Sequence, residues 1–345
     1  MRIAEISTLQ RPVKPDSTAS VESLVYTITE GLVERGHDVT LFALAGSRTS
    51  ARLQSPVETS YSVDGSKWDW QLYEAYQVRE AFRRWKDFDI IHCHSYHHGL
   101  LCCDFVSIPS LHSIHIDPGP DYVFLGQLVK KRHLVFCSKY QARDFAGMRD
   151  VYIIPHGLDM QQYYLCDEER REPYLAFLGR FMPDKGPLEA IQFARKVGLP
   201  IKLAGEENEY FQEYIAPEIQ KGGVEYAGEL RGSQKIDFLA RAKALLYPLQ
   251  RGEPFGLVLI EAMACGLPVL ALNKGASPEI IEHGQTGWLG WTMKDLEDGF
   301  KHLEEFDPVL IRKRAEERYS VDIMIDRLEQ LMQQIIEERN NASRR

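Results

Sequence analysis

Long apolar runs are missing from this chain of 345 residues. No run approaches the ~20 apolar residues that span a bilayer, so transmembrane helices are not expected. The first residues reach an acidic side chain at Glu5 and lack the apolar stretch and small-residue cleavage site of a signal peptide. We interpret this segment as a buried first strand.

Cysteine patterns typical of metal sites or disulfides are also missing. No CxxC or CxxH spacing occurs among the six cysteines, which are Cys93, Cys102, Cys103, Cys137, Cys166 and Cys265. The pattern predicts neither a zinc site nor a disulfide framework. We expect reduced, mostly buried thiols in a cytoplasmic protein.

An excess of basic charge is absent as well. The net charge is −9, and residues 161–345 carry 24 basic against 31 acidic side chains. A polyanion-binding surface, and with it a nucleic-acid partner, is not expected. Gly-x-Gly-x-x-Gly and Walker sequences are missing too, so dinucleotide enzymes and P-loop ATPases lose their main support. A bound phosphate must rely on a few placed cations and backbone amides.

Short apolar runs alternate with stretches of helical period, which is typical of βαβ units. The alternation predicts an α/β protein with two Rossmann-like doubly wound domains in tandem. Strands are expected at Arg2–Ile6, Val39–Ala43, Ile90–His94, Val135–Ser138, Tyr152–Pro155, Leu175–Leu178, Ile201–Ala204, Val224–Tyr226, Ala244–Tyr247 and Val269–Leu272. Helices are expected at Ser20–Arg35, Gln71–Lys86, Gln141–Phe145, Gly186–Val197, Ser233–Ala240 and Gly256–Ala264.

The expected domains follow from this series. Residues 1–160 form an N-terminal domain, residues 161–173 a linker with a charged run, and residues 174–320 a C-terminal domain. Residues 321–345 form an amphipathic C-terminal helix and a polar tail.

One candidate site surrounds the helix expected to start at Gly256. Its free N–H groups and positive dipole end suit a diphosphate, and a glycine there lets a ligand approach the backbone. Glu253 precedes the helix and Glu261 lies inside it, so the two carboxylates address different parts of a ligand. The alternative is a pair of solvated carboxylates beside an ordinary helix start.

A second candidate is the loop that runs from Gly179 to Gly186 after an expected strand. Open α/β sheets bind ligands at the carboxyl ends of their strands. Arg180 can form forked hydrogen bonds to phosphate oxygens, and Lys185 can supply a point charge. The alternative is an ordinary connecting loop with a solvated lysine.

Both segments, in this order, resemble those of family 4 glycosyltransferases ("glycosyl transferases group 1"), which are retaining enzymes of the GT-B fold. The Gly-Arg-x(4)-Lys-Gly loop and the E-x(7)-E motif of that family are intact. Similarity extends to nearly the whole chain through residues 35–40, 154–159 and 277–287. The resemblance implies two domains that face each other across a cleft.

Site roles also follow from the resemblance. It implies that Arg180 and Lys185 hold the donor diphosphate, that Glu261 holds the ribose hydroxyls, and that Glu253 holds the transferred sugar. Gly179 and the amides of Phe255, Gly256, Leu257 and Val258 would meet the donor. His112 matches the histidine of the family near the 6-position of the sugar, with His115 as the alternative.

The resemblance further implies a metal-independent transfer from a UDP-, GDP- or ADP-sugar, without a cofactor. The acceptor would be a carbohydrate, a lipid-linked molecule or a small molecule. One departure is that Ala19 and Ser20 stand where the family usually has two glycines that close on the donor phosphates. This departure leaves open a weak or inactive paralogue that binds a nucleotide sugar. A nucleotide-sugar epimerase or a phosphorylase on the same fold is a further alternative.

Three other features have weaker functional interpretations. Trp68, Trp70, Tyr73 and Tyr76 could stack on an acceptor sugar, although such aromatics are usually core residues. The histidines at 92, 94, 97 and 98 superficially resemble a metal site, but alternation along a strand would place the side chains on opposite faces of the sheet. Residues 130–132 are basic and could touch anionic lipid weakly, although such a run is usually a solvated face.

Overall fold

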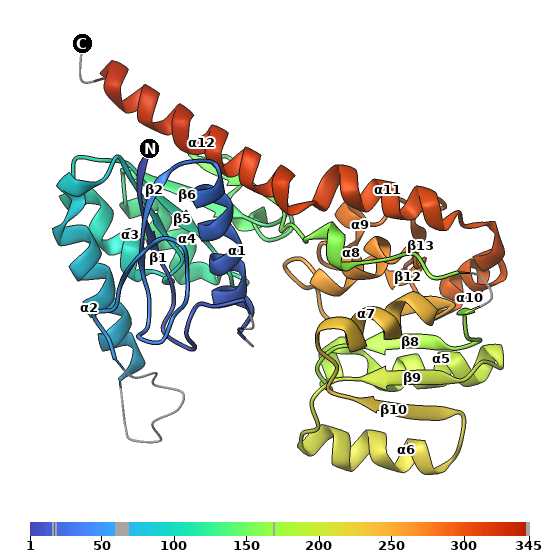
Figure 1. Ribbon diagram of the computed structural model, residues 1–345. Helices are drawn as coiled ribbons and strands as arrows, with labels where there is room; N and C mark the ends of the chain where they lie inside the picture. The colour runs from blue at the N-terminus through green and yellow to red at the C-terminus, as the bar shows by residue number, and fades with distance from the viewer. Residues whose placement is uncertain (16, 18, 59–68, 168–169, 343–345) are drawn as a thin grey trace. The chain divides into compact units, whose positions relative to one another are not determined.

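The computed structural model describes residues 1–15, 17, 19–58, 69–167 and 170–342 (Figure 1). The chain forms two compact units. Unit 1 comprises Met1–Pro155 and Val321–Arg345, and unit 2 comprises His156–Ser320. Among the described helices, none is long and apolar enough to cross a membrane.

Unit 1 is built on a seven-stranded parallel sheet in the order β3-β2-β1-β4-β5-β6-β7. The strands are β1 Arg2–Ile6, β2 Asp38–Phe42, β3 Arg52–Gln54, β4 Ile90–Cys93, β5 Ser110–Ser113, β6 Arg132–Phe136 and β7 Val151–Ile153. The chain runs outward from β1 to β3 and then returns to β4 on the other side of β1. The carboxyl ends of β1 and β4 therefore lie at a topological switch point, where open α/β sheets bind ligands.

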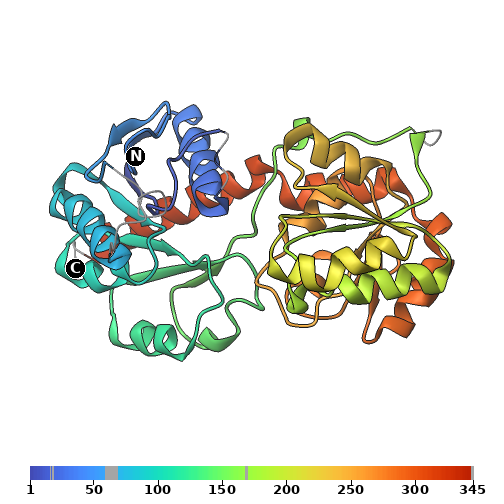
Figure 2. The ribbon, with the colours of Figure 1, turned by 90° about the horizontal axis from the view of Figure 1, so that it is seen from below.

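Helices cover the sheet of unit 1. They are α1 Ser20–Glu34, α2 Trp70–Arg83, α3 His98–Cys102, α4 Pro120–Leu128 and α12 Val321–Ala342, with short 3-10 turns at η1 Trp85–Asp87, η2 Cys103–Phe105 and η3 Arg143–Phe145. Figure 2 shows α1 in blue and α12 in red side by side. Ile325 and Leu328 of α12 pack into the same core as Leu32 of α1.

Unit 2 is built on a six-stranded parallel sheet in the order β10-β9-β8-β11-β12-β13. The strands are β8 Leu175–Leu178, β9 Ile201–Ala204, β10 Val224–Gly228, β11 Ala244–Tyr247, β12 Val269–Leu272 and β13 Gly287–Gly290. The helices are α5 Pro187–Val197, α6 Ala216–Gln220, α7 Gly232–Arg241, α8 Leu257–Ala264, α9 Ser277–Ile280, α10 Met293–Lys301 and α11 Pro308–Tyr319. Short turns are η4 Met160–Gln162, η6 Pro183–Lys185, η7 Phe211–Ile215 and η8 Leu303–Glu305. Here the switch point lies between β8 and β11.

The predicted α/β class with two doubly wound units is confirmed. The predicted division of the chain differs from the structure in two places. Unit 1 ends at Pro155, before the expected boundary at 160, and the C-terminal helix belongs to unit 1 because its apolar face packs on the core of that unit. Residues 168 and 169 of the expected linker lie outside the described residues.

Some predicted elements were wrong or missed. The expected helix Gln141–Phe145 is only the single 3-10 turn η3. Three strands, β3, β5 and β13, were not predicted. In β13, a Cβ on Gly287 would lie 2.2 Å from the carbonyl oxygen of Val269, so only glycine allows this pairing.

Candidate active site

The loop after β8 is packed against the end of β11 in unit 2. Gly186 has φ +73°, and a Cβ there would lie 2.2 Å from the carbonyl oxygen of Pro248. Only glycine combines this backbone conformation with this close approach. The loop therefore carries Lys185 to the switch point between β8 and β11.

Lys185 and Glu253 form an ion pair at this point. The Nζ of Lys185 lies 2.7 Å from Oε1 of Glu253, and their side chains are 12% and 28% exposed. The hydroxyl of Tyr247, the last residue of β11, donates to the other carboxylate oxygen. Burial and the charge of Glu253 raise the pKa of Tyr247 well above its usual value, so its proton stays in place. Both oxygens of Glu253 are thus held.

The segment after Glu253 turns sharply into α8. Gly256 has φ +93°, and a Cβ there would lie 2.6 Å from the Tyr247 hydroxyl oxygen. The first N–H groups of α8 have no partner within the helix. Phe255 is buried, with its ring 4.9 Å from that of His156, so its backbone and not its side chain suits a ligand. At the start of α8, Leu257 is exposed.

Glu261 is held separately, inside α8. It is 8% exposed, and its Oε1 forms an ion pair with Lys235 of α7. Tyr163 donates to the same oxygen over 3.4 Å. Glu261 is therefore an anchored carboxylate rather than a solvated one, which contradicts the alternative of an ordinary helix surface.

Arg180 has different surroundings from Lys185. It follows β8 by two residues and is exposed. In the described part of the chain it makes no hydrogen bond or ion pair. The two cations of the predicted loop thus differ, because Lys185 is already paired whereas Arg180 extends into solvent.

In unit 1, Ala19 and Ser20 form the start of α1. Ala19 is the N-cap residue, with φ −90° and ψ 131°, and Ser20 is exposed. These angles suit any residue. The backbone at Ala19 therefore needs no glycine in this conformation.

His112 lies within β5 and is enclosed. It is 1% exposed, and its Nε2 lies 2.9 Å from the Ser110 hydroxyl oxygen. Burial lowers its pKa to about 3, so the imidazole is neutral. Within unit 1, His112 is thus enclosed by the core, and its Nδ1 makes no hydrogen bond among the described residues. His115, two residues beyond β5, is half-buried and reaches the surface.

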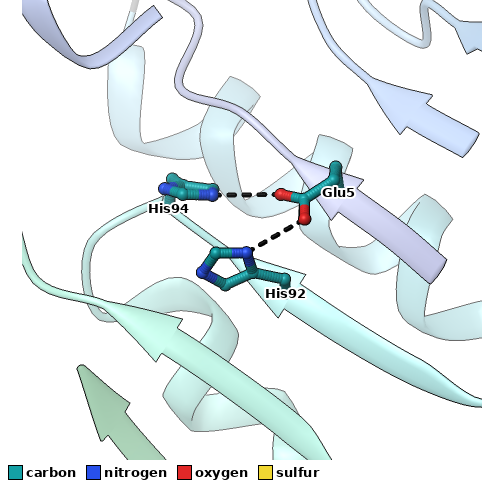
Figure 3. Close-up of side chains that lie close together, drawn as sticks. All are labelled: Glu5, His92 and His94. Carbon is teal, nitrogen blue, oxygen red and sulfur yellow. Dashed lines mark hydrogen bonds and ion pairs between the residues drawn. The ribbon is translucent and has the colours of Figure 1, made fainter. Parts of the chain in front are cut away.

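The histidines of β4 meet Glu5 in the interior of unit 1 (Figure 3). His92 Nδ1 lies 3.0 Å from Oε1 of Glu5, and His94 Nε2 lies 3.1 Å from Oε2. Alternation along β4 separates Cys93 from the two histidines but leaves His92 and His94 on one face, so the argument that alternation disperses them is wrong. These three residues are the only such group in the described residues that could hold a metal ion.

Sequence reasoning missed Tyr247, Lys235 and Glu5 as partners of the site residues. Tyr247 and Glu5 lie at or beside the carboxyl ends of predicted strands, and this position was an available signal. No sequence pattern indicated Lys235, because its contact with Glu261 depends on the packing of α7 against α8.

The aromatic and basic residues considered above lie as follows. Trp68 lies outside the described residues. The Trp70 ring lies 5.5 Å from that of Tyr96, Tyr73 packs on a small core, and Tyr76 is exposed. In the basic run, the Lys131 amide and ammonium groups bond to Asp104.

Two family descriptions match the sequence. Residues 167–338 match "Glycosyl transferases group 1", and residues 21–162 match "Glycosyltransferase Family 4". The chain is 24% identical over 321 residues to a glycogen synthase of Mycobacterium tuberculosis, and the aligned region covers 76% of each protein.

Solved structures share the fold. Anabaena HepE in complex with UDP and glucose superimposes with a TM-score of 0.72 at 18% identity, over 97% of this chain and 100% of that one. Sucrose-phosphate synthase from Thermosynechococcus elongatus superimposes with a TM-score of 0.77 at 18% identity, over 98% and 99% of the two chains.

Proposed function

This chain belongs to the family 4, group 1 glycosyltransferases and is an enzyme of the GT-B fold, and from that premise we propose a specific reaction. A hexose-type sugar moves from a nucleoside-diphosphate sugar to an acceptor hydroxyl. The configuration at the reacting carbon is retained, and no metal ion takes part.

The observation that carries the proposal is the contact between Lys185 and Glu253. It joins two motifs that are far apart in the sequence at the switch point of unit 2. A cation for the diphosphate and a carboxylate for the sugar therefore lie side by side, as the two ends of one donor require.

Negative charge that develops on the leaving diphosphate would be stabilised without a metal. Lys185 and Arg180 supply positive charge, and the amides of residues 255–258 supply hydrogen bonds at the start of α8. Fixed groups of this kind need no rearrangement during the reaction, which is the source of electrostatic catalysis. Gly179 and Gly256 keep the backbone open to the ligand.

Positive charge that grows on the sugar ring would be stabilised by Glu253. Tyr247 and Lys185 hold its two oxygens, so the carboxylate keeps one orientation. Glu261 would accept hydrogen bonds from the ribose hydroxyls, and its ion pair with Lys235 keeps it oriented. The incoming hydroxyl would attack on the face of the leaving group, assisted by the leaving phosphate, without a covalent intermediate.

The histidine that contacts the transferred sugar near its 6-position is reassigned. His112 is enclosed, so we assign this role to His115, which is half-buried beyond the carboxyl end of β5.

UDP-sugars are the first donors to test, because the HepE complex contains UDP. GDP- and ADP-sugars follow. The acceptor is a carbohydrate, a lipid-linked molecule or a small molecule, and nucleic acid is not a partner.

The six free cysteines suit a reducing, cytoplasmic compartment. The basic side chains of residues 130–132 could form a weak contact with an anionic membrane surface.

The proposal is tested by substitution of the two cations. First, a thermal-shift screen with UDP, GDP, ADP and dTDP and their sugars identifies the donor, because a ligand of the folded state raises the unfolding temperature. With that donor, Arg180→Ala and Lys185→Ala should each lower kcat/KM by about 100-fold or more at unchanged unfolding temperature. EDTA should leave the wild-type rate unchanged, and NMR should show the product with the anomeric configuration of the donor.

Matched controls come from exposed cations of unit 2 away from the site. Arg241→Ala and Lys221→Ala, which lie before β11 and β10 at the opposite edge of the sheet, remove the same charges beside Glu172 and Glu218 and should keep the wild-type rate. Full turnover by Arg180→Ala or Lys185→Ala would refute the proposal. Release of free nucleotide without an acceptor would indicate an epimerase, a requirement for inorganic phosphate would indicate a phosphorylase, and binding without any turnover would indicate an inactive paralogue.

A further inference from the structure

Large apolar side chains are exposed on neighbouring elements of unit 1, namely α3, η2 and α4. They are Leu101, Phe105, Phe124 and Leu128. Each is more than half exposed, and Phe105 is 86% exposed. They form two pairs with a spacing of four residues, one in α3 and η2 and one in α4. Single exposed apolar residues are common, but several on adjoining elements indicate a contact surface.

Hydrogen bonds join η2 to the end of the α4 segment. The carboxylate of Asp104 accepts from the backbone amides of Lys130 and Lys131, over 3.3 and 2.9 Å. The ammonium group of Lys131 donates to the carbonyl oxygen of Val106 over 2.9 Å. Since Phe105 lies between Asp104 and Val106 in the chain, it adjoins Lys131.

An apolar core lies beneath the same segments. Cys102 of α3, Leu125 of α4 and Val129 belong to one apolar cluster. Phe124 and Leu128 directly precede Leu125 and Val129, so they lie together on the outer side of α4. We call the exposed residues of these segments the α3–α4 surface. It comprises Leu101, Phe105, Phe124, Leu128, Lys130 and Lys131.

The positive charge beside these apolar residues is not neutralised by ion pairs. Within the described ranges, Lys130, Lys131 and Arg132 form no ion pair. Lys131 and Arg132 donate to backbone carbonyl oxygens instead. Asp104 contacts this run through its amides. The protein as a whole carries a net charge of −9, so the run is a local excess of positive charge.

The α3–α4 surface reaches the edge of the sheet that is opposite to the ligand edge. The turn η2 precedes β5, and Lys131 directly precedes β6. Adjacent parallel strands begin at the same edge, so Phe105 and Lys131 lie at the amino edge of the sheet. Open α/β sheets bind ligands at the carboxyl edge. A partner on Phe105 and Lys131 therefore leaves the ligand edge of unit 1 free.

We infer that the α3–α4 surface binds an anionic lipid bilayer, with its apolar side chains among the upper acyl chains and its lysines at the lipid phosphates. Exposed apolar residues beside basic ones are typical of proteins that lie on a membrane surface. Lysine suits this position, because its apolar stem can stay near the acyl chains while its ammonium group reaches the headgroups. The inference concerns a partner and does not depend on the proposed reaction.

Other partners fit this surface less well. A nucleic acid would meet the cations but would leave the aliphatic side chains of Leu101 and Leu128 without an apolar partner. A second copy would bring the lysines of both copies together, because a two-fold interface joins the same surface of each. An anionic bilayer supplies both the negative charge and the apolar layer.

Binding is measured by co-sedimentation of the full chain with lipid vesicles. Vesicles of equal parts of phosphatidylcholine and phosphatidylglycerol should sediment the protein, and vesicles of phosphatidylcholine alone should sediment less of it. Added salt should weaken binding to the anionic vesicles without abolishing it, because ions screen the lysines but not the apolar contact. Hydrogen exchange of the bound protein should slow in residues 101–105 and 124–131.

Two substitutions separate the apolar part from the charged part. Phe105→Ser should lower the partition coefficient on anionic vesicles by about tenfold or more, because a large apolar side chain is no longer removed from water. Lys130→Gln should lower it by about fivefold on anionic vesicles and should not change it on neutral ones. Both side chains are exposed, so the unfolding temperature should stay that of the wild type.

Trp291→Ser and Lys294→Gln are the matched controls in unit 2. Trp291 is an exposed aromatic residue, and Lys294 is an exposed cation near it in the chain. Both variants should bind anionic vesicles as the wild type does. If either lowers the partition coefficient as much as Phe105→Ser does, binding is not specific to the α3–α4 surface and the inference fails.

Further results would also overturn the inference. One is equal sedimentation of the wild type and Phe105→Ser. Another is a dimer in analytical ultracentrifugation that Phe105→Ser dissociates, which would assign the surface to a second copy. Displacement of the vesicles by duplex DNA would assign it to nucleic acid. The vesicle assay contains no nucleotide sugar, so failure of the proposed reaction would leave its result unchanged.

Discussion

At the scale of single residues, the best-defined feature is the contact of Gly256 with Tyr247 and, through it, with Glu253. Gly256 joins a positive φ to a close approach, since a Cβ would lie 2.6 Å from the Tyr247 hydroxyl oxygen. This hydroxyl donates to Glu253. One glycine thus decides both the start of α8 and the orientation of the carboxylate proposed to face the sugar.

Gly256→Ala should therefore affect activity more than stability. Strain at positive φ costs about 1–3 kcal/mol, and displacement of Tyr247 should additionally lower kcat. Gly198→Ala is the control, because Gly198 ends α5 at the opposite edge of the sheet, with φ +74° and nothing within 4 Å of its Cβ position. In urea unfolding Gly256→Ala should lose at least as much stability as the control, and only Gly256→Ala should lose turnover. Equal turnover in both would contradict the role of this contact.

At the scale of elements, α12 shows how a late segment completes an early unit. Met324, Ile325, Leu328 and Met332 lie in one core with Ile3 of β1 and Ile28 of α1. A Cβ on Gly31 would lie 2.8 Å from Ile325, so the two helices are packed closely. Arg35 after α1 also forms an ion pair with Asp326 over 2.7 Å.

Leu328→Ala should destabilise unit 1 selectively. Its side chain is 2% exposed, and truncation of a buried leucine costs about 2–5 kcal/mol. Hydrogen exchange read by mass spectrometry should show faster exchange in residues 1–155, with residues 156–320 unaffected. Arg327→Ala, exposed on the same helix turn, should change neither. Faster exchange confined to residues 156–320 would contradict the assignment of α12 to unit 1.

At the scale of the whole molecule, the two units differ in their buried titratable groups. Unit 1 buries Glu5, His94, His98 and His112. Burial lowers the pKa of His94 and of His98 to about 4 and that of His112 to about 3, from 6.5. Below pH 6.5 the unfolded chain binds protons that the folded unit does not, so stability falls as the pH drops toward 4.

Two buried carboxyl groups also contribute to the pH dependence of the stability of unit 1. Glu5, with its pKa lowered from 4.5 to about 2, adds a loss of stability below pH 4.5. Glu74 acts in the opposite direction, because burial raises its pKa to about 7 and the folded unit then gains stability as the pH falls from about 7 to 4.5. Between pH 6.5 and 4.5, the stability lost through the three histidines exceeds the stability gained through Glu74.

Acidification should therefore open unit 1 before unit 2. Hydrogen exchange measured between pH 7 and 5, corrected for the intrinsic rate, should show earlier loss of protection in residues 1–155. His112→Asn should reduce the pH dependence of this loss, whatever its stability at neutral pH. Earlier opening of residues 156–320 would contradict the prediction.

The amino-acid sequence by itself determined the class of fold and the binding loops of unit 2. Buried parallel strands such as β8, β9, β11 and β12 are continuous apolar runs, and their predicted bounds agree with the structure. The family resemblance implied one donor site for Lys185 and Glu253, and in the structure their side chains form an ion pair. The sequence was sufficient to predict these strands and motifs because each is defined by a few consecutive residues.

Only the tertiary structure decided features that depend on distant neighbours. The strand β5, Ser-Leu-His-Ser, has one apolar residue, and it forms because β4 and β6 supply hydrogen bonds on both sides. His112 of this strand is buried, whereas His115 beyond its end is half-buried. The place of α12 in unit 1, the partnership of Lys235 with Glu261, and the contact of Glu5 with His94 join residues from separate elements. Sequence spacing carries no information on such contacts, because packing alone brings them together.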